Sequence, residues 1–233
     1  MKGFRTALGI LAALAIAVVA FLWLNFYHVH VRYRLTVEVQ DGNQIKTGSS
    51  VIDVSYSIEP DWTPSGPNAK VRTIGYAPTV DLGEKGLLFL SFANAQRSPD
   101  QIRESSKKVF CLVNDIGCLP VAAYDKPGTV IGSVSSPERR AALREVLSQS
   151  GPRDVPFAVL PRLLRSLNVD HPNPLVTVSP DDLSGSFGPG VQLKRVTLQL
   201  TDDPVTPMPT IWPQWLKENG HIDDAILKGY QNG

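Results

Sequence analysis

Adjacent aspartates are the residues of this sequence whose type and spacing best suit chemistry. They occur as Asp181-Asp182, Asp202-Asp203 and Asp223-Asp224. Paired carboxylates can bind calcium or act as general acid and base, but none of these pairs continues into the Asp-x-Asp-x-Asp-Gly pattern of a calcium loop. We interpret them as solvated turn residues. An enzyme with scattered catalytic groups is the alternative, and Asp181, Asp202, Asp203 and His171 would be its first candidates.

The segment Gly185-Ser186-Phe187-Gly188 is the nearest match to a serine-nucleophile motif. Its serine stands one place too early for Gly-x-Ser-x-Gly. The glycines up to Gly190 precede an expected strand and have no lysine-serine or lysine-threonine after them, whereas phosphate-binding loops precede helices. We expect a loop over 185–190. The sequence predicts no catalytic residue and no cofactor.

The two cysteines, Cys111 and Cys118, flank Asn114-Asp115. A two-residue turn there would place them opposite each other across a hairpin, and a disulfide would stabilise the fold by about 2.5 kcal/mol through loop-closure entropy. Unpaired buried thiols are the alternative. A zinc site is disfavoured because no second cysteine pair is present.

Two histidines, His28 and His30, have a spacing that places both rings on one side of a strand. Metal sites use this spacing, but polar-tipped rings are also common at membrane interfaces. We favour the interfacial interpretation and predict no metal site.

Two tryptophans near the C-terminus, Trp212 and Trp215, follow a proline-rich extended segment. They are candidates for anchoring a partner protein. The alternative, which we favour, is that they fold back and cap the core, because so much apolar surface is costly to leave in water.

The N-terminal region contains a long apolar segment, residues 7–27, without a charged side chain. As a helix it would reach about 32 Å, which matches a hydrocarbon core of about 30 Å. Trp23, Phe26 and Tyr27 would form an aromatic belt at the interface. A cleaved signal peptide is the alternative, with small-x-small sites at 13–15 and 15–17, but the apolar run continues past both. We therefore predict an uncleaved signal-anchor.

The predicted organisation has a cytoplasmic tail at 1–6, a transmembrane helix at 7–27 and an extracytoplasmic domain at 28–233. Positive charges are nearly balanced across the span, with Lys2 and Arg5 before it and Arg32 and Arg34 after it. We choose the orientation with the N-terminus inside because long C-terminal domains translocate largely regardless of charge. The chain is therefore predicted to be a single-pass membrane protein.

Alternating apolar and polar residues predict an α+β domain with a mixed, mainly antiparallel sheet and two or three helices. We expect a hairpin of 31–40 and 50–58, strands at 70–76 and 86–92, and a strand with a bulge at 192–200. Capping signals predict helices from Ser98 and from Ser136. The leucines at 160–167 suggest a further short helix, and another is expected to begin within Trp212 to Leu216. Residues 59–68 are a candidate internal linker.

Composition excludes several classes of protein. Hydrophobic residues make up 42% and charged residues 19%, so the chain can bury a core and is not a disordered sequence. The 23 basic and 22 acidic side chains nearly cancel. Binding to nucleic acid is disfavoured because it would require a basic excess.

The C-terminal half resembles a group of uncharacterised bacterial membrane-anchored proteins. Those proteins also have an N-terminal anchor followed by a strand pair like Tyr33 to Val54. The resemblance covers about half of the chain and lies in Ser179-Pro180-Asp181-Asp182-Leu183, Phe187-Gly188-Pro189-Gly190-Val191, Leu193-Lys194-Arg195, Thr201-Asp202-Asp203-Pro204-Val205-Thr206 and Trp215-Leu216. It implies a bacterial envelope protein and brings no activity, cofactor or catalytic residue.

The sequence therefore favours a membrane-tethered, non-catalytic interaction or accessory module. Its partners would be the lipid bilayer, through residues 7–27, and an envelope protein. An envelope hydrolase or transferase is one alternative. A sensor of a small ligand is another, and it would need a large apolar pocket.

Overall fold

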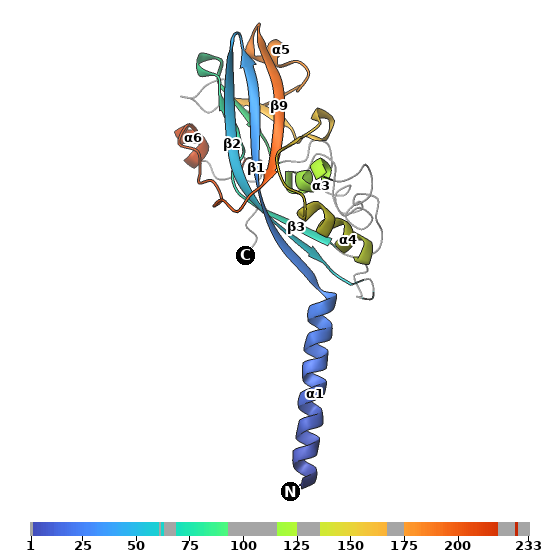
Figure 1. Cartoon of the computed structure of the whole chain (residues 1–233). Coiled ribbons are helices and arrows are strands. Elements are labelled where there is room, and N and C mark those ends of the chain that lie inside the picture. Colours follow the sequence, from blue (N-terminus) through green and yellow to red (C-terminus); the bar gives the residue numbers. More distant parts are fainter. Residues whose placement is uncertain are drawn as a thin grey trace.

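A β-rich domain with one long projecting helix, α1 (Lys2–Asn25), makes up the molecule (Figure 1). The computed structural model describes residues 2–60, 62, 69–92, 116–124, 136–166, 175–218 and 227. The side chains of residues 2–8 and 22–25 are not among those described. Four of the sequence predictions also lie outside the described residues: the helix from Ser98, Cys111, His171 and Asp223-Asp224.

A long antiparallel hairpin follows α1 after one intervening residue. Its strands, β1 (Tyr27–Asp41) and β2 (Gln44–Ile58), pair from Tyr27↔Ile58 to Asp41↔Gln44. The turn between them contains Gly42 with φ 59°, a conformation that favours glycine. The predicted hairpin is confirmed, and its paired region is longer than expected.

The hairpin forms the centre of a five-stranded antiparallel sheet. The order is β3-β2-β1-β9-β6, with β3 (Ala69–Ile74), β6 (Arg153–Asp154) and β9 (Val191–Leu200). The register between β1 and β9 shifts at Glu38/Val39 and skips Lys194, which confirms the predicted bulge. Residues 59–68 connect β2 to its neighbour β3.

A second sheet has the order β4-β5-β7-β8, again antiparallel. Its strands are β4 (Thr79–Asp81), β5 (Leu87–Leu90), β7 (Leu163–Ser166) and β8 (Val176–Val178). All four residues of β5 are buried, which fits their continuous apolar run and the strand predicted at 86–92. The helix expected over 160–167 is wrong. Leu163 and Leu164 lie on opposite faces of β7 and enter two different hydrophobic clusters.

The main core lies between the two sheets and extends under three short helices. These are α3 (Leu119–Tyr124), α4 (Ser136–Leu147) and α5 (Leu183–Phe187). Short 3-10 turns complete the connections at η1 (Gly83–Lys85), η2 (Ile116–Cys118) and η3 (Phe157–Val159). The sheets approach closely at Gly48, where a Cβ atom would lie only 2.1 Å from the backbone oxygen of Thr79.

A smaller core covers the other face of the second sheet. There the C-terminal segment and α6 (Gln214–Glu218) pack against Leu87, Phe89 and Leu164. The helix predicted from Ser136 is confirmed as α4, whose Leu143 and Val146 are buried. The loop predicted over 185–190 is wrong in its first half, because residues up to Phe187 belong to α5.

The α+β class with antiparallel sheets is confirmed. The described residues of the domain form four short α-helices, more than the two or three expected. Among the residues that the structure describes, none of the helices has the length and apolar character needed to cross a membrane.

Candidate functional site

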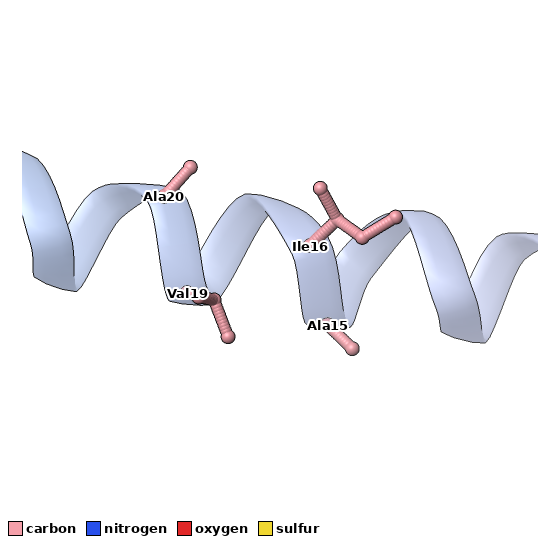
Figure 2. A pocket seen from close by; sticks show the side chains of 4 residues that line it. All are labelled: Ala15, Ile16, Val19 and Ala20. Atoms are coloured by element: carbon pink, nitrogen blue, oxygen red, sulfur yellow. The ribbon is translucent and has the colours of Figure 1, made fainter.

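The helix α1 presents apolar side chains that the domain does not cover. Every side chain described in it, from residue 9 to residue 21, is exposed. The large apolar side chains are between 52% and 70% exposed and comprise Ile10, Leu11, Leu14, Ile16, Val18, Val19 and Phe21. The four side chains drawn in Figure 2, Ala15, Ile16, Val19 and Ala20, line a shallow, open hollow on this helix. This hollow lies outside the domain, so it is not the enclosed apolar pocket that a small-ligand sensor would need.

An aromatic cluster lies where α1 meets the domain. The indole ring of Trp62 stacks on Phe21 with a centroid distance of 5.9 Å, and it meets Phe26 edge-on at 6.3 Å. The guanidinium of Arg144, from α4, lies 5.9 Å from the centre of the Tyr27 ring. We call these five residues, Phe21, Phe26, Tyr27, Trp62 and Arg144, the collar.

The collar includes two of the three predicted interface aromatics, Phe26 and Tyr27. The third, Trp23, lies within α1, but its side chain is not among those described. Trp62 was missed by the sequence analysis although it is 57% exposed. No local signal marks it: Trp62 reaches the end of α1 because Ile58 pairs with Tyr27, a register that only the structure shows.

Histidine and serine side chains form a ladder on the outer face of the hairpin, next to the collar. His28 Nδ1 lies 2.9 Å from Ser57 Oγ, and His30 Nδ1 lies 2.9 Å from Ser55 Oγ. Asp53 lies 3.7 Å from the same nitrogen of His30. A catalytic triad would place serine and aspartate on opposite ring nitrogens, so this arrangement does not activate Ser55.

Both histidines lie on one side of β1, as the sequence predicted. Within the residues that the structure describes, no group of three or more histidine, cysteine, aspartate or glutamate side chains is placed to hold a metal ion.

The acids Asp202 and Asp203 fasten the chain that leaves β9. We call residues 201–213 the strap. Arg32 donates to the backbone oxygens of Asp202 and Asp203 at 2.9 and 3.0 Å, and Arg34 donates to Asp203 Oδ2 at 2.6 Å. Further along the strap, Thr206 Oγ1 accepts from the Val51 amide at 2.8 Å. These contacts tie the strap to β1 and β2.

The carboxylate of Asp203 is held in its ionised form. The Thr201 hydroxyl donates to it at 2.6 Å, and this bond together with the Arg34 guanidinium holds the pKa of Asp203 below its ordinary value. A carboxylate so stabilised is a poor general acid or base near neutral pH. The geometry fits a structural role in which Arg34, Thr201 and Asp203 hold the strap on β1, and we call these three residues the latch.

The acids Asp181 and Asp182 belong to the start of α5. Asp182 Oδ1 accepts from the Gly185 amide at 2.9 Å as the helix cap, and this bond lowers the pKa of Asp182. Both acids are exposed at the turn that leads into α5, in agreement with their interpretation as solvated turn residues. Along the chain, Asp181 and Asp182 come before α5 and β9, and Asp202 and Asp203 come after the end of β9, whose 10 residues reach about 30 Å. The suspected catalytic acids are therefore not brought together.

The strap ends on Trp212, which is buried at 5% exposure. Its indole N–H donates to Thr79 Oγ1 at 2.7 Å, and its ring meets Tyr76 and Phe89 edge-on. Trp215 is partly buried against the same cluster. In this structure both tryptophans cap the second sheet, as the favoured interpretation expected.

The cysteine at 118 lies in η2 and not in a strand, so the hairpin expected around Asn114-Asp115 is wrong for this arm. Phenol groups of Tyr33 and Tyr56 hold the turn by donating to the backbone oxygens of Ile116 and Gly117, each at 2.6 Å. Cys118 is buried and disulfide-bonded. The pairing with Cys111, which lies outside the described residues, stays a prediction.

Comparisons with protein-family models, with curated proteins and with solved structures found no match for this chain.

Proposed function

We propose that this chain is a membrane-tethered, non-catalytic α+β module on the outer face of a bacterial inner membrane. In this proposal α1 is the anchor, and the domain serves as an interaction or accessory module for another envelope protein. The observation that carries the proposal is the uncovered apolar surface of α1.

The length of α1 supports an anchoring role. The part of α1 with described side chains, residues 9–21, is too short for a span by itself. The whole helix of 24 residues would reach about 36 Å at a rise of roughly 1.5 Å per residue, against a hydrocarbon core of about 30 Å. Apolar surface costs about 25 cal/mol per Å² in water, so seven large apolar side chains exposed on one helix favour burial in lipid. A cleaved signal peptide is the competing explanation.

The disulfide state of Cys118 supports an extracytoplasmic domain, since disulfides persist in oxidising compartments and are rare in the bacterial cytosol. A non-catalytic role is supported by the structural contacts of the candidate acids. Asp182 caps α5, and Asp203 latches the strap.

Membrane fractionation of a Gram-negative bacterium that expresses the full tagged chain tests the anchor. We expect the chain to stay in the pellet after an alkaline carbonate wash, to retain its N-terminal residues by intact mass, and to be digested by protease in spheroplasts. Release by the wash, or a mature chain that begins after residue 20, would refute tethering. Protection from protease in spheroplasts but not in lysed cells would refute the orientation.

A matched pair of substitutions tests which apolar surface meets lipid. Ile16 on α1 is 70% exposed and Ile211 on the strap is 42% exposed. Arginine near the middle of a spanning helix costs about 2.5–3.5 kcal/mol. Ile16→Arg should therefore shift part of the chain out of the carbonate-resistant pellet, and Ile211→Arg should not.

Crosslinking in intact envelopes tests the accessory role. The domain should capture a specific envelope protein that is absent from a control with an unrelated domain on the same anchor. Capture of nothing above that background would count against an interaction module.

A further inference from the structure

We propose that Trp62 forms a second membrane contact, so that the collar seats the domain in the headgroup region of the bilayer. This inference rests on the proposed anchoring of α1. It adds an interaction surface on the domain itself, and the partner it fits is a bilayer that contains anionic lipid.

The backbone geometry places Trp62 at the depth of the last turn of α1. The strand β2 ends at Ile58, directly opposite Tyr27, the first residue of β1. Trp62 comes four residues later and stacks on Phe21, which precedes the end of α1 by four residues. Because the indole contacts both Phe21 and Phe26, it lies between their depths, within about 6 Å of the domain end of α1 on its membrane side. If α1 spans the membrane, this is where the acyl chains meet the headgroups.

The chemistry of the collar matches that layer. Tryptophan and tyrosine combine an apolar ring with a polar group and are enriched where acyl chains meet headgroups. The indole of Trp62 is 57% exposed even though it packs against two phenylalanines. The exposed guanidinium of Arg144 lies over the Tyr27 ring, where a lipid phosphate can meet it.

The collar also explains how the domain keeps a fixed orientation relative to α1 across a short connection. Only Phe26 separates α1 from β1, and one residue alone would leave the domain free to tilt. Packing of Trp62 on Phe21 and Phe26 adds a second point of attachment from a different segment of the chain. Two contacts at one depth fix both the height and the tilt of the domain.

Fluorine NMR on the intact chain tests the proposed contact of Trp62 with lipid. The four tryptophans of the sequence are replaced biosynthetically by 5-fluorotryptophan, and each signal is assigned with a tryptophan-to-phenylalanine variant. The chain is placed in nanodiscs of phosphatidylcholine and phosphatidylglycerol with a lipid that carries a spin label near the top of its acyl chain. Line broadening then reports which indoles lie beside lipid.

We expect loss of the Trp23 and Trp62 signals and retention of the Trp212 signal, since Trp212 is buried in the domain. Broadening of the Trp23 signal with a sharp Trp62 signal would overturn the proposed lipid contact of Trp62 and would not affect the proposal that α1 is the anchor. Sharp signals from both would overturn the anchor as well. The two proposals are thereby separated.

Lipid charge tests the cationic part of the collar. Broadening of Trp62 should be greater with phosphatidylglycerol than with phosphatidylcholine alone, and Arg144→Gln should remove that difference. Lys194→Gln is the matched control, because Lys194 is an exposed cation on β9 outside the collar. Equal broadening of Trp62 in both lipid mixtures would overturn the part assigned to anionic headgroups.

Discussion

Removal of the Trp212 side chain should unfold the C-terminal cap of the second sheet. Its indole is 5% exposed and lies between Tyr76 and Phe89, with ring centroids at 5.7 and 6.0 Å. A buried tryptophan removes about 150–250 Å² from water, and truncation of tryptophan to alanine in a core typically costs about 3–5 kcal/mol. We expect a loss of that size for Trp212→Ala.

The hydrogen bond contributes separately and can be isolated. Trp212→Phe keeps an aromatic ring but leaves buried Thr79 Oγ1 without its donor, which costs about 1–3 kcal/mol. Thr79→Val removes the other partner. A double-mutant cycle between the two substitutions should therefore give a coupling energy of about 1 kcal/mol.

Urea unfolding of the intact chain in detergent micelles, followed by far-ultraviolet circular dichroism, measures these changes. Ile211→Ala is the control, since the neighbouring Ile211 is 42% exposed and should change stability by less than about 0.5 kcal/mol. If Trp212→Ala is as stable as this control, the cap is not part of the folded core. Retained stability together with lost capture of a partner would instead favour Trp212 as a partner anchor.

Two further predictions concern the closest approach of the sheets and the latch on the strap. Gly48→Ala should lower the free energy of unfolding by about 1–3 kcal/mol in the same urea assay, because its Cβ would lie 2.1 Å from the oxygen of Thr79 and the sheets would have to separate. The control is Ser49→Ala at the exposed neighbouring residue. Equal stability of the two variants would contradict this packing. Asp203→Asn should destabilise the strap at pH 7, because the pKa of Asp203 in the native state lies below its value in the unfolded state. The stabilisation by the ionised carboxylate is therefore complete above about pH 4, and it is lost as the pH falls through the native pKa. Hydrogen exchange at the Thr206 amide, which donates to the Val51 oxygen, should therefore differ between wild type and variant at neutral pH and converge in acid, and a constant difference across that range would refute the latch.

The hairpin was predictable because its signal is local. Residues alternate between the core and the outer face along β1, and side chains in a strand alternate in the same way. The turn residues at Gly42 are equally local. The capping signal at Ser136 is short-range too, and α4 begins there. The cap of α5 at Asp182 is equally local, but the sequence analysis expected a loop over 185–190 and missed this helix.

The error over 160–167 shows where local signals fail. A strand buried on both faces has no alternation, so its apolar residues resemble those of a buried helix. The sequence could not show that Leu163 faces the main core while Leu164 faces the smaller one, because the smaller core exists only through α6 and the strap. The distinction depends on packing between segments far apart in the sequence.

The latch and the collar were unpredictable for the same reason. Arg34 and Asp203 are 169 positions apart, and Trp62 meets Phe21 only because β2 returns along the whole length of β1. Each of these residues has an ordinary local context. Their roles follow from strand register, which a single sequence specifies only after the fold is known.

The direct connection between α1 and β1 makes the strand register important for function. The collar packs on the end of α1, and β1, at the centre of the five-stranded sheet, joins that end to β2 and β9 through their hydrogen-bond ladders. The strap bonds to both β1 and β2, through Arg32 and Val51, and continues to Trp212 on the second sheet. The end of the domain next to α1 and the second sheet are thus joined by hydrogen bonds through β1, β2 and the strap. If the proposed tether holds, a domain built this way would present its surfaces to a partner at a fixed height and angle above the membrane.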